Sequence, residues 1–343
     1  MQPTERSLRI LYAVQGTGNG HVARAREILP ILARYGAVDV FVGGDQSEVD
    51  LGFPVRFRSK GLTFIYDRSG AVSLSKTLFK NNLIRIIREI RQFNLSPYQL
   101  VINDFEFITA WAGRLRKQRV FGWGHQASFL SERCPRPAVR SWHGEWILKH
   151  YAPCTDPIGL HFDRFDSFVH TPIIRSEIRA LRPENRGHYT VYLPAFGSEE
   201  LVEALGSIEG VEWHIFSKFA KSEERKGTLW IRPVNNADFL ESFSGCAGVL
   251  TGAGFETPAE ALFMGKKLCC IPIRRQYEQY CNAAALKTMG VPIVDRLDEE
   301  GRAVVRDWVR QGQPLQVDYP DHTQTLIEAL IRSIVAVPTA PSA

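Results

Sequence analysis

The sequence predicts an α/β protein of two Rossmann-like, doubly wound domains that face each other across a cleft. Short apolar runs alternate with amphipathic segments of helical periodicity, an order typical of parallel sheets covered by helices. The 343 residues suffice for two domains of ordinary size. Glycine-rich turns at residues 15–21 and 251–254 follow apolar strands, and such turns mark the ligand-binding edge of these sheets.

The first half begins with the strand, turn, helix and strand that open a doubly wound sheet. Its later amphipathic helix gathers leucine and isoleucine on one face and arginines on the other. That helix is either packed on the sheet or in contact with a membrane surface. The expected strands are residues 8–14, 38–42, 53–57, 62–66, 100–102, 119–123 and 165–169, and the expected helices are 22–35 and 78–93.

The second half repeats the alternation of strands and helices. Its expected strands are residues 189–193, 211–216, 229–231, 247–250, 267–273 and 292–294. Its expected helices are residues 199–207, 237–244, 255–264, 299–311 and 322–335. We place the first domain at residues 1–165 and the second at 166–318. The segment 319–343 is expected to form a helix that packs back toward the first domain and to end in a disordered tail.

Composition excludes several classes of protein. Hydrophobic residues make up 44% and charged residues 23%, as in soluble globular proteins. No apolar run approaches the roughly 18 residues that a transmembrane helix needs, and the first residues lack the pattern of a signal peptide. The six cysteines contain no CxxC pair, so neither a zinc site nor a disulfide framework is expected. We therefore expect a cytoplasmic protein.

The positive charge is concentrated in the first half. Residues 1–170 carry 23 Lys and Arg against 15 Asp and Glu, whereas residues 171–343 carry 19 against 22. This excess favours an anionic acceptor or peripheral contact with the cytoplasmic face of a membrane, and solubility alone is the other interpretation. No nucleic-acid partner is expected.

The glycine turn of the second half has the properties of a nucleotide-sugar site. The turn at residues 251–254 leaves backbone N–H groups unpaired at the start of a helix, where the helix dipole favours a diphosphate. Glu260, one turn into that helix, is suited to accept hydrogen bonds from a ribose diol. Glu278, Gln279 and Asn282 follow the next strand and suit the hydroxyls of a sugar.

Two motifs resemble those of GT-B glycosyltransferases, of the type formed by the UDP-glycosyltransferases and MurG. One is GTGNGH at residues 16–21, and the other begins with GAGFETPAEA at residues 252–261. The resemblance implies inverting, metal-independent transfer of a hexosyl or N-acetylhexosaminyl group from a UDP-linked or other nucleoside diphosphate sugar to an acceptor hydroxyl. It points to glycolipid, cell-envelope or polysaccharide synthesis, with a lipid, saccharide or small-molecule acceptor. The nucleotide sugar is a co-substrate, and no cofactor is expected.

The resemblance also implies roles for particular residues. His21 matches the histidine that acts as general base, and Asp104 lies where an aspartate orients that base. His125 is a rival base or an acceptor contact. A histidine, with its ordinary pKa near 6.5, suits proton removal near neutral pH. Asp45 and Glu106 are expected to be solvated loop acids.

The donor positions implied by the motifs are Gly18, Gly20, Gly252, Ala253, Gly254, Phe255, Glu256, Thr257, Glu260, Gln276, Glu278, Gln279 and Asn282. Gly252 replaces a phosphate-contacting histidine or arginine of many relatives, so Thr257 and the backbone must bind more of the phosphate. Thr257 and Glu260 also fit a helix capping box, a structural reason for the same residues. No metal site is expected, because no Asp-x-Asp pair follows a strand and helix amides can carry the charge of the leaving diphosphate.

Three other functions compete with the transferase. A sugar-nucleotide epimerase of the same fold would act on the donor without any acceptor. A non-catalytic subunit would bind a nucleoside diphosphate sugar without transferring it. A dinucleotide-dependent oxidoreductase is disfavoured because His21 stands where its glycine motif needs a third small residue.

Overall fold

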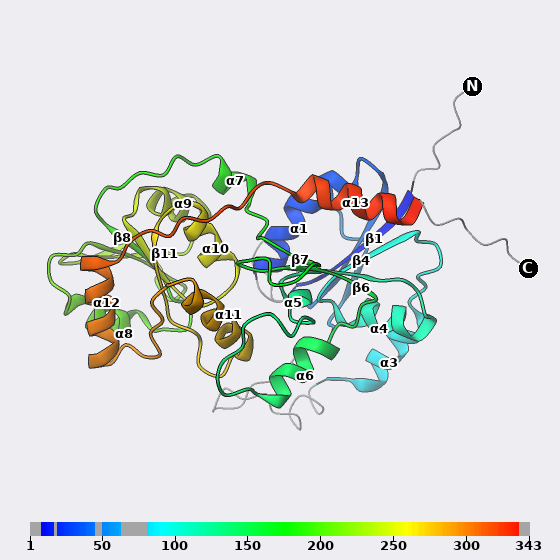
Figure 1. Ribbon diagram of the computed structural model, residues 1–343, viewed down its shortest axis with the longest axis horizontal. Helices are drawn as coiled ribbons and strands as arrows, with labels where there is room; N and C mark the ends of the chain where they lie inside the picture. Colours follow the sequence, from blue (N-terminus) through cyan, green and yellow to red (C-terminus); the bar gives the residue numbers. More distant parts are fainter. Residues whose placement is uncertain (1–7, 17–18, 45–49, 63–80, 336–343) are drawn as a thin grey trace, which may run out of the picture. The chain divides into compact units, whose positions relative to one another are not determined.

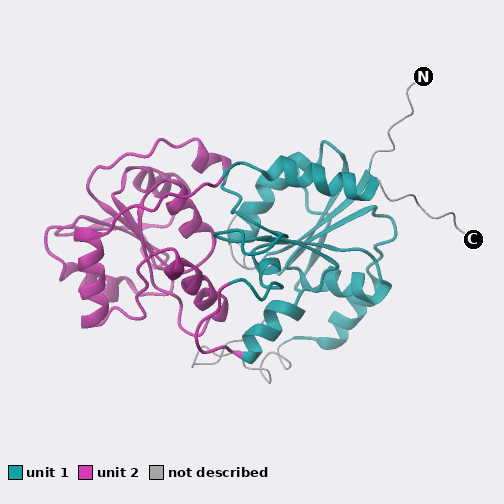
Figure 2. Ribbon diagram, viewed as in Figure 1, with its two compact units in different colours: residues 1–134, 142–175, 320–343 teal, residues 135–141, 176–319 magenta. Residues whose placement is uncertain are grey.

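The computed structural model describes residues 8–16, 19–44, 50–62 and 81–335. The chain forms two units: residues 1–134, 142–175 and 320–343 belong to unit 1, and residues 135–141 and 176–319 to unit 2 (Figure 2). The main division lies between residues 175 and 176, whereas the sequence predicts the end of the first domain at residue 165. The reason is that strand β7 (Val169–His170) still pairs with the first sheet.

Unit 1 contains a seven-stranded sheet in the order β3-β2-β1-β4-β5-β6-β7, in which all neighbouring strands are parallel (Figure 1). This order, with the first strand near the middle, is that of a Rossmann-like domain. The central strands are buried because helices cover such sheets on both faces. The other bounds are β1 (Leu8–Gln15), β2 (Gly36–Gly43), β3 (Phe57–Ser59), β4 (Leu100–Asp104), β5 (Phe121–Gly124) and β6 (Asp156–Leu160).

The helices of unit 1 come from both ends of the chain. They are α1 (Asn19–Leu32), α3 (Leu83–Gln92), α4 (Phe107–Arg116), α5 (His125–Ser128), α6 (Trp142–His150) and α13 (Thr323–Val335). The terminal helix α13 lies beside α1, where the Tyr35 hydroxyl donates to Oε1 of Glu328 over 3.5 Å (Figure 1). The last helix of the chain is therefore part of the first unit.

Unit 2 contains a six-stranded sheet in the order β10-β11-β9-β8-β12-β13. Its strands are β8 (Tyr189–Tyr192), β9 (Trp213–Ser217), β10 (Glu224–Lys226), β11 (Leu229–Pro233), β12 (Gly248–Thr251) and β13 (Lys267–Cys270). Only the edge pair β10–β11 is antiparallel among the pairs of this described sheet. Its helices are α7 (Ser176–Arg179), α8 (Ser198–Gly206), α9 (Asn236–Gly245), α10 (Glu256–Phe263), α11 (Tyr277–Thr288) and α12 (Glu299–Gln311).

Several expected strands differ from those observed. The strand expected at 53–57 begins only at Phe57, because Pro54 has no N–H to donate to a neighbouring strand. The strand β6 was not expected, and β7 contains only the last residue of the segment 165–169. Ile293, in the segment expected as the last strand, makes a single bridge to Cys270. The strand expected at 62–66 lies outside the described residues after Leu62.

No helix among the described residues has the length and apolar character needed to cross a membrane. The helix α3 buries Ile86, and it exposes Leu83, Ile84 and Ile87 together with Arg88 and Arg91. Each unit has its own group of predicted site residues at the carboxyl ends of its strands, which are the ligand-binding ends of such sheets.

Candidate active site

In unit 1, two neighbouring strands bring a histidine and an aspartate together. Val14 of β1 and Asp104 of β4 are paired in the parallel register, so both strands end at the same edge of the sheet. His21 lies in the first turn of α1, directly beyond β1. Nδ1 of His21 lies 2.7 Å from Oδ1 of Asp104. The sequence-predicted pair therefore forms a direct hydrogen bond.

Asp104 is fully buried and holds a network of hydrogen bonds. Arg24 donates to it twice, from Nε to Oδ2 over 3.0 Å and from Nη2 to Oδ1 over 2.8 Å. The Tyr12 hydroxyl donates to Oδ2 over 3.3 Å. Burial alone would raise the pKa of Asp104, but the charges of Arg24 and His21 and their hydrogen bonds lower it below its usual value. Asp104 is therefore an ionised carboxylate.

The ionised carboxylate fixes the tautomer of His21. A carboxylate only accepts hydrogen bonds, so Nδ1 of His21 carries the proton shared with Asp104. In the neutral ring, Nε2 then keeps its lone pair. The side chain of His21 is 13% exposed, whereas that of Asp104 is fully buried. This arrangement can remove a proton from a hydroxyl at Nε2 while Asp104 stabilises the charge that forms on the ring.

The turn after β4 supports this pair. Phe105 has φ = 57°, a left-handed conformation that is uncommon for a bulky residue and is found at functional sites. Its ring lies parallel to that of His21, with centroids 6.3 Å apart, and packs against Tyr151 at 4.8 Å. The turn thus places an aromatic surface beside the histidine.

Glu106 is not the solvated acid that we had expected. It is fully buried and caps α4, where its carboxylate accepts from the N–H groups of Ile108 and Thr109 over 2.7 Å each. Burial raises the pKa of Glu106 to about 7, although these hydrogen bonds oppose the rise. The expectation for Glu106 failed because a helix begins directly after it. Asp45 lies outside the described residues.

His125, the rival base, is 1% exposed. Its Nδ1 lies 2.9 Å from the carbonyl oxygen of Leu160, to which it donates. The ring packs edge-on against Phe129 and His161, with centroids 4.9 Å away in both cases. His125 therefore lies in the packed layer between α5 and β6.

A small cavity opens next to Phe105 at the ends of β4 and β5. Its volume of about 20 Å³ has room for about one water molecule. Residues that line it include Asn103, Phe105, Trp123, Gln126, Leu130 and Leu148. The buried indole N–H of Trp123 has no hydrogen-bond acceptor in the described part of the chain.

In unit 2, the glycine turn leads from β12 into α10. The helix begins at Glu256 after Phe255, whose side chain makes no capping hydrogen bond. Thr257 is therefore inside the first turn rather than at the cap, and the expected capping box is wrong. A Cβ atom on Gly254 would meet no described atom within 4 Å, so there is open space at the turn. A helix start beside open space is a geometry that suits an anion.

The other predicted donor residues surround this turn. Asn282 is fully buried, and its Nδ2 donates to the carbonyl of Ala253 over 3.0 Å. Oε1 of Gln279 accepts from the N–H of Ile273 over 2.8 Å, and its Nε2 donates to Gln276 over 3.1 Å. These amides hold the turn and the loop after β13 in place.

The remaining predicted donor positions differ in burial. Glu260 is 2% exposed in α10, and Glu278 lies in the first turn of α11. Ala253 and Phe255 are buried, whereas Gly252, Glu256 and Thr257 are partly exposed. Gly20 lies at the start of α1, and Gly18 lies outside the described residues. Within the described chain, no group of three or more His, Cys, Asp or Glu side chains forms a metal-binding cluster.

Sequence reasoning missed Arg24, Tyr12 and Phe105. Arg24 follows His21 by three residues on α1, so both side chains lie on one face of the helix. That spacing was the only available signal for Arg24. The sequence gives no signal for the conformation of Phe105. A positive φ is favoured by Gly, Asn and Asp and is rare for a bulky aromatic residue.

Comparison with known proteins agrees with this architecture. The model of glycosyl transferase family 1 matches residues 8–123 and 161–311. No protein with a curated description matches the sequence. Similar solved structures include MurG from Acinetobacter baumannii, which is 14% identical with a TM-score of 0.54 over 95% of this chain and 99% of that chain.

Two further solved structures are similar to this chain over most of their length. SsfS6, a glycosyltransferase of Streptomyces sp. SF2575 complexed with thymidine diphosphate, is 13% identical with a TM-score of 0.55, over 94% of this chain and 99% of that chain. Phytolacca americana UGT2, complexed with UDP-2-fluoro-glucose and pterostilbene, is 14% identical with a TM-score of 0.55, over 96% of this chain and 100% of that chain. These likenesses show the GT-B fold. The chain belongs to glycosyl transferase family 1 and is a GT-B glycosyltransferase of the MurG and UDP-glycosyltransferase type.

Proposed function

We propose that this enzyme transfers a hexosyl or N-acetylhexosaminyl group from a UDP-linked sugar to an acceptor hydroxyl, with inversion and without a metal ion. The observation that carries the proposal is the hydrogen bond of 2.7 Å between Nδ1 of His21 and the buried, ionised Asp104. It leaves Nε2 of His21 as the atom that accepts a proton. Pairs of this kind activate hydroxyl nucleophiles in many enzymes.

In the proposed reaction, Nε2 of His21 takes the proton from the acceptor hydroxyl. The acceptor oxygen forms a bond to the anomeric carbon on the face opposite the diphosphate. The bond between that carbon and the diphosphate oxygen breaks, and the electron pair leaves with the nucleoside diphosphate. Asp104 stabilises the imidazolium until the proton is released.

The donor is assigned to the turn and helices of unit 2. The N–H groups at the start of α10 and the helix dipole stabilise the diphosphate as its charge grows. Glu260 accepts hydrogen bonds from the ribose, and Glu278 and Gln279 contact the sugar. The ligands named for SsfS6 and UGT2, thymidine diphosphate and a UDP-sugar analogue, support a nucleoside diphosphate sugar as donor.

The acceptor is assigned to unit 1, beside His21 and the aromatic surface of Phe105 and Tyr151. We propose a lipid-linked acceptor at the cytoplasmic face of a membrane, in glycolipid or cell-envelope synthesis. The support is α3, where Ile84 is 76% and Ile87 49% exposed. Arg88 and Arg91 on the same helix are also exposed. Apolar and basic side chains on one surface helix suit an anionic lipid surface.

A panel of nucleoside diphosphate sugars, measured by thermal shift, tests the donor class. We expect UDP-glucose or UDP-N-acetylglucosamine to raise the melting temperature, because a ligand that binds the folded state stabilises it. The best donor, radiolabelled in the sugar, is then incubated with a lipid extract. Labelled lipid supports the proposal. If no nucleotide sugar raises the melting temperature, the proposed donor class is wrong.

The same samples separate the competing functions. Isomerised UDP-sugar in the absence of acceptor, detected by NMR, would identify an epimerase. Tight UDP binding with no labelled product from lipid, saccharide or small-molecule extracts would identify a non-catalytic subunit. Sedimentation with anionic vesicles, compared with neutral vesicles and with an Ile84→Asp variant, tests the membrane contact independently.

A further inference from the structure

We propose that Arg24 is a positioning residue for the His21–Asp104 pair, because its two hydrogen bonds hold the Asp104 carboxylate against Nδ1 of His21. The inference rests on the proposed function, in which His21 is the base. Its test reads the protonation of the His21 ring directly and does not depend on sugar transfer.

The side chain of Arg24 is buried together with that of Asp104. The side chain is 3% exposed and Asp104 is fully buried, so water screens neither charge. The guanidinium donates to both carboxylate oxygens, over 3.0 and 2.8 Å. A Cβ atom on Gly124 would lie 2.8 Å from Nη2 of Arg24 and 2.9 Å from Oδ1 of Asp104. The backbone of β5 therefore encloses the ion pair.

The geometry gives Arg24 a specific effect on orientation. Two parallel hydrogen bonds from a planar guanidinium fix the plane of a carboxylate, which a lysine ammonium does not do. The fixed plane directs Oδ1 of Asp104 to Nδ1 of His21. Nη2 of Arg24 also lies 3.1 Å from Nδ1 of His21, so the three side chains form one compact group.

The charges of this group explain why the arginine matters. Arg24 and Asp104 neutralise each other, so the group is neutral overall when His21 is neutral. Without Arg24, a buried carboxylate would retain only the Tyr12 hydroxyl and His21 as partners within the described residues. A buried unpaired carboxylate takes up a proton or draws one onto its neighbour.

Both outcomes remove the lone pair on Nε2 of His21. A protonated Asp104 donates to Nδ1, which moves the ring proton to Nε2. An ionised Asp104 without Arg24 instead favours the imidazolium, in which both ring nitrogens carry protons. In either state, His21 no longer accepts a proton from a hydroxyl.

The test uses the full chain labelled with ¹⁵N-histidine, with the His21 signals identified by comparison with a His21→Gln variant. At neutral pH we expect Nδ1 of His21 to carry a proton and Nε2 to carry none. In Arg24→Gln, we expect that pattern to be replaced by Nε2 protonation or by a doubly protonated ring. Arg24→Lys retains the charge and is expected to retain the wild-type pattern.

The kinetic readout follows the spectroscopic one. We expect Arg24→Gln to lower kcat by about 10²-fold or more, within the range of a general base, with an unchanged KM for the donor. Arg24→Lys is expected to recover part of that loss. A wild-type nitrogen pattern in folded Arg24→Gln would overturn the proposal. If Arg24→Gln does not fold, loss of the pattern in Arg24→Lys would overturn it.

The role of Arg24 and the role of His21 as base can fail independently. If His21→Gln keeps full transfer activity, the base assignment fails, but the nitrogen signals of Arg24→Gln still report what Arg24 does to the pair. If the nitrogen signals are unchanged and only the melting temperature falls, Arg24 does no more than join α1 to β4.

Discussion

Oε1 of Gln279 accepts a hydrogen bond from the backbone N–H of Ile273, over 2.8 Å. The proposed function places Gln279 against the donor sugar, and one end of its amide already holds the loop between β13 and α11. In that loop Arg275 adopts a left-handed conformation with φ = 66°. Gln279 therefore shapes the loop as well as standing beside the proposed donor site.

This relationship predicts different outcomes for two substitutions of Gln279. Gln279→Leu removes the acceptor for the N–H of Ile273 and is expected to weaken binding of the UDP-sugar by about tenfold, equivalent to one lost hydrogen bond. Gln279→Glu keeps an acceptor and is expected to bind more tightly than Gln279→Leu. Calorimetry with the best donor gives both affinities. Equal affinities for Gln279→Leu and the wild type would show that the loop needs no such support.

His21→Ala is expected to abolish most transfer while leaving donor binding unchanged. The loss should be about 10²- to 10⁴-fold in kcat, the usual contribution of a general base. Donor binding should be retained because His21 is proposed to act on the acceptor hydroxyl and not on the nucleotide. The matched control is His143→Ala, which removes an exposed histidine of α6 in the same unit. If His21→Ala keeps its turnover, the base must be another residue, and His125→Ala is then the variant to measure.

Much of the fold was predictable because local patterns decide it. The strand β1 and the helix α12 lie within a residue of their predicted bounds, since an apolar run and a helical period of hydrophobic residues specify them directly. The strand β6 was missed because Pro157 argues against a strand there. Its place in the sheet is set by pairing with β5, which no local pattern reveals.

The site was predictable only in part. Motif order located His21 and Asp104, and the structure joins them across 83 positions of sequence. The partnership of Arg24 with Asp104 spans 80 positions and depends on the register of β1 and β4. Such pairs are set by tertiary packing, so a single sequence names the candidates but not the contacts. The same holds for Gln279, whose loop-holding contact has no sequence signal.

Glu260→Ala is expected to weaken UDP binding by at least tenfold. A carboxylate that accepts hydrogen bonds from a ribose contributes about 1.5–3 kcal/mol, because one partner is charged. The control is Glu300→Ala, which removes an exposed carboxylate of α12 in the same unit. Calorimetry with UDP compares the two variants. An unchanged affinity for Glu260→Ala would leave Glu260 with a purely structural place in α10.

Lys266→Met is expected to destabilise unit 2. Nζ of Lys266 is buried and donates to three backbone carbonyls, those of Glu184 over 2.6 Å, Ser244 over 2.7 Å and Cys246 over 2.8 Å. Two of these carbonyls lie at or just beyond the end of α9, where a positive charge is favourable.

Loss of these hydrogen bonds should lower the free energy of unfolding by about 3 kcal/mol, since buried carbonyls lose a charged donor. Urea unfolding followed by tryptophan fluorescence measures it. Lys287→Met, at an exposed position of α11, is the control and should change the midpoint little. Similar midpoints for the two variants would contradict the role of Lys266.

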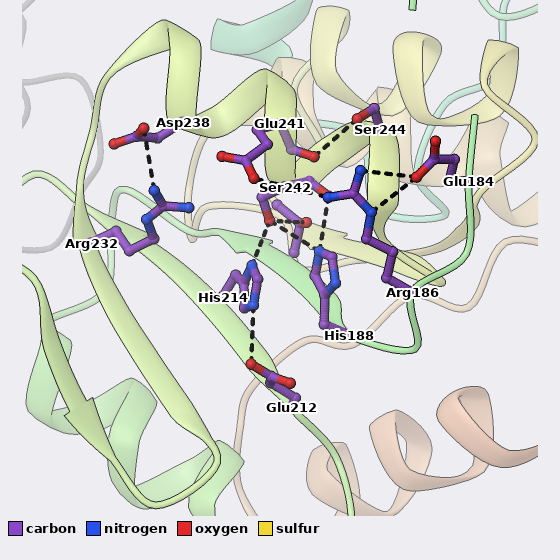
Figure 3. Close-up of polar contacts among 11 residues, drawn as sticks. Glu184, Arg186, His188, Glu212, His214, Arg232, Asp238, Glu241, Ser242 and Ser244 are labelled. Carbon is purple, nitrogen blue, oxygen red and sulfur yellow. Dashed lines mark hydrogen bonds and ion pairs between the residues drawn. The ribbon is translucent and has the colours of Figure 1, made fainter. Parts of the chain in front are cut away.

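A buried histidine pair predicts that unit 2 loses stability in acid. The rings of His188 and His214 stack with centroids 3.9 Å apart, and both side chains reach Ser242 of α9 (Figure 3). Burial lowers the pKa of His188, and burial and the charge of His188 lower that of His214 to about 4 from 6.5. The folded state therefore favours the neutral form of both rings, and protonation of either ring destabilises it.

The sign of the effect follows from these pKa values. Between pH 6.5 and about 4, the unfolded chain binds a proton at His214 that the folded chain does not, so stability falls as the pH falls. The contribution of His214 over that range is on the order of 3 kcal/mol. His214→Gln retains a polar side chain near Ser242 and removes the titrating ring. Urea unfolding from pH 8 to pH 4 should therefore show a shallower loss of stability for the variant than for the wild type, with the curves diverging below pH 6.5. Parallel curves would mean that His214 has the same pKa in the folded and the unfolded chain. That result would contradict the prediction.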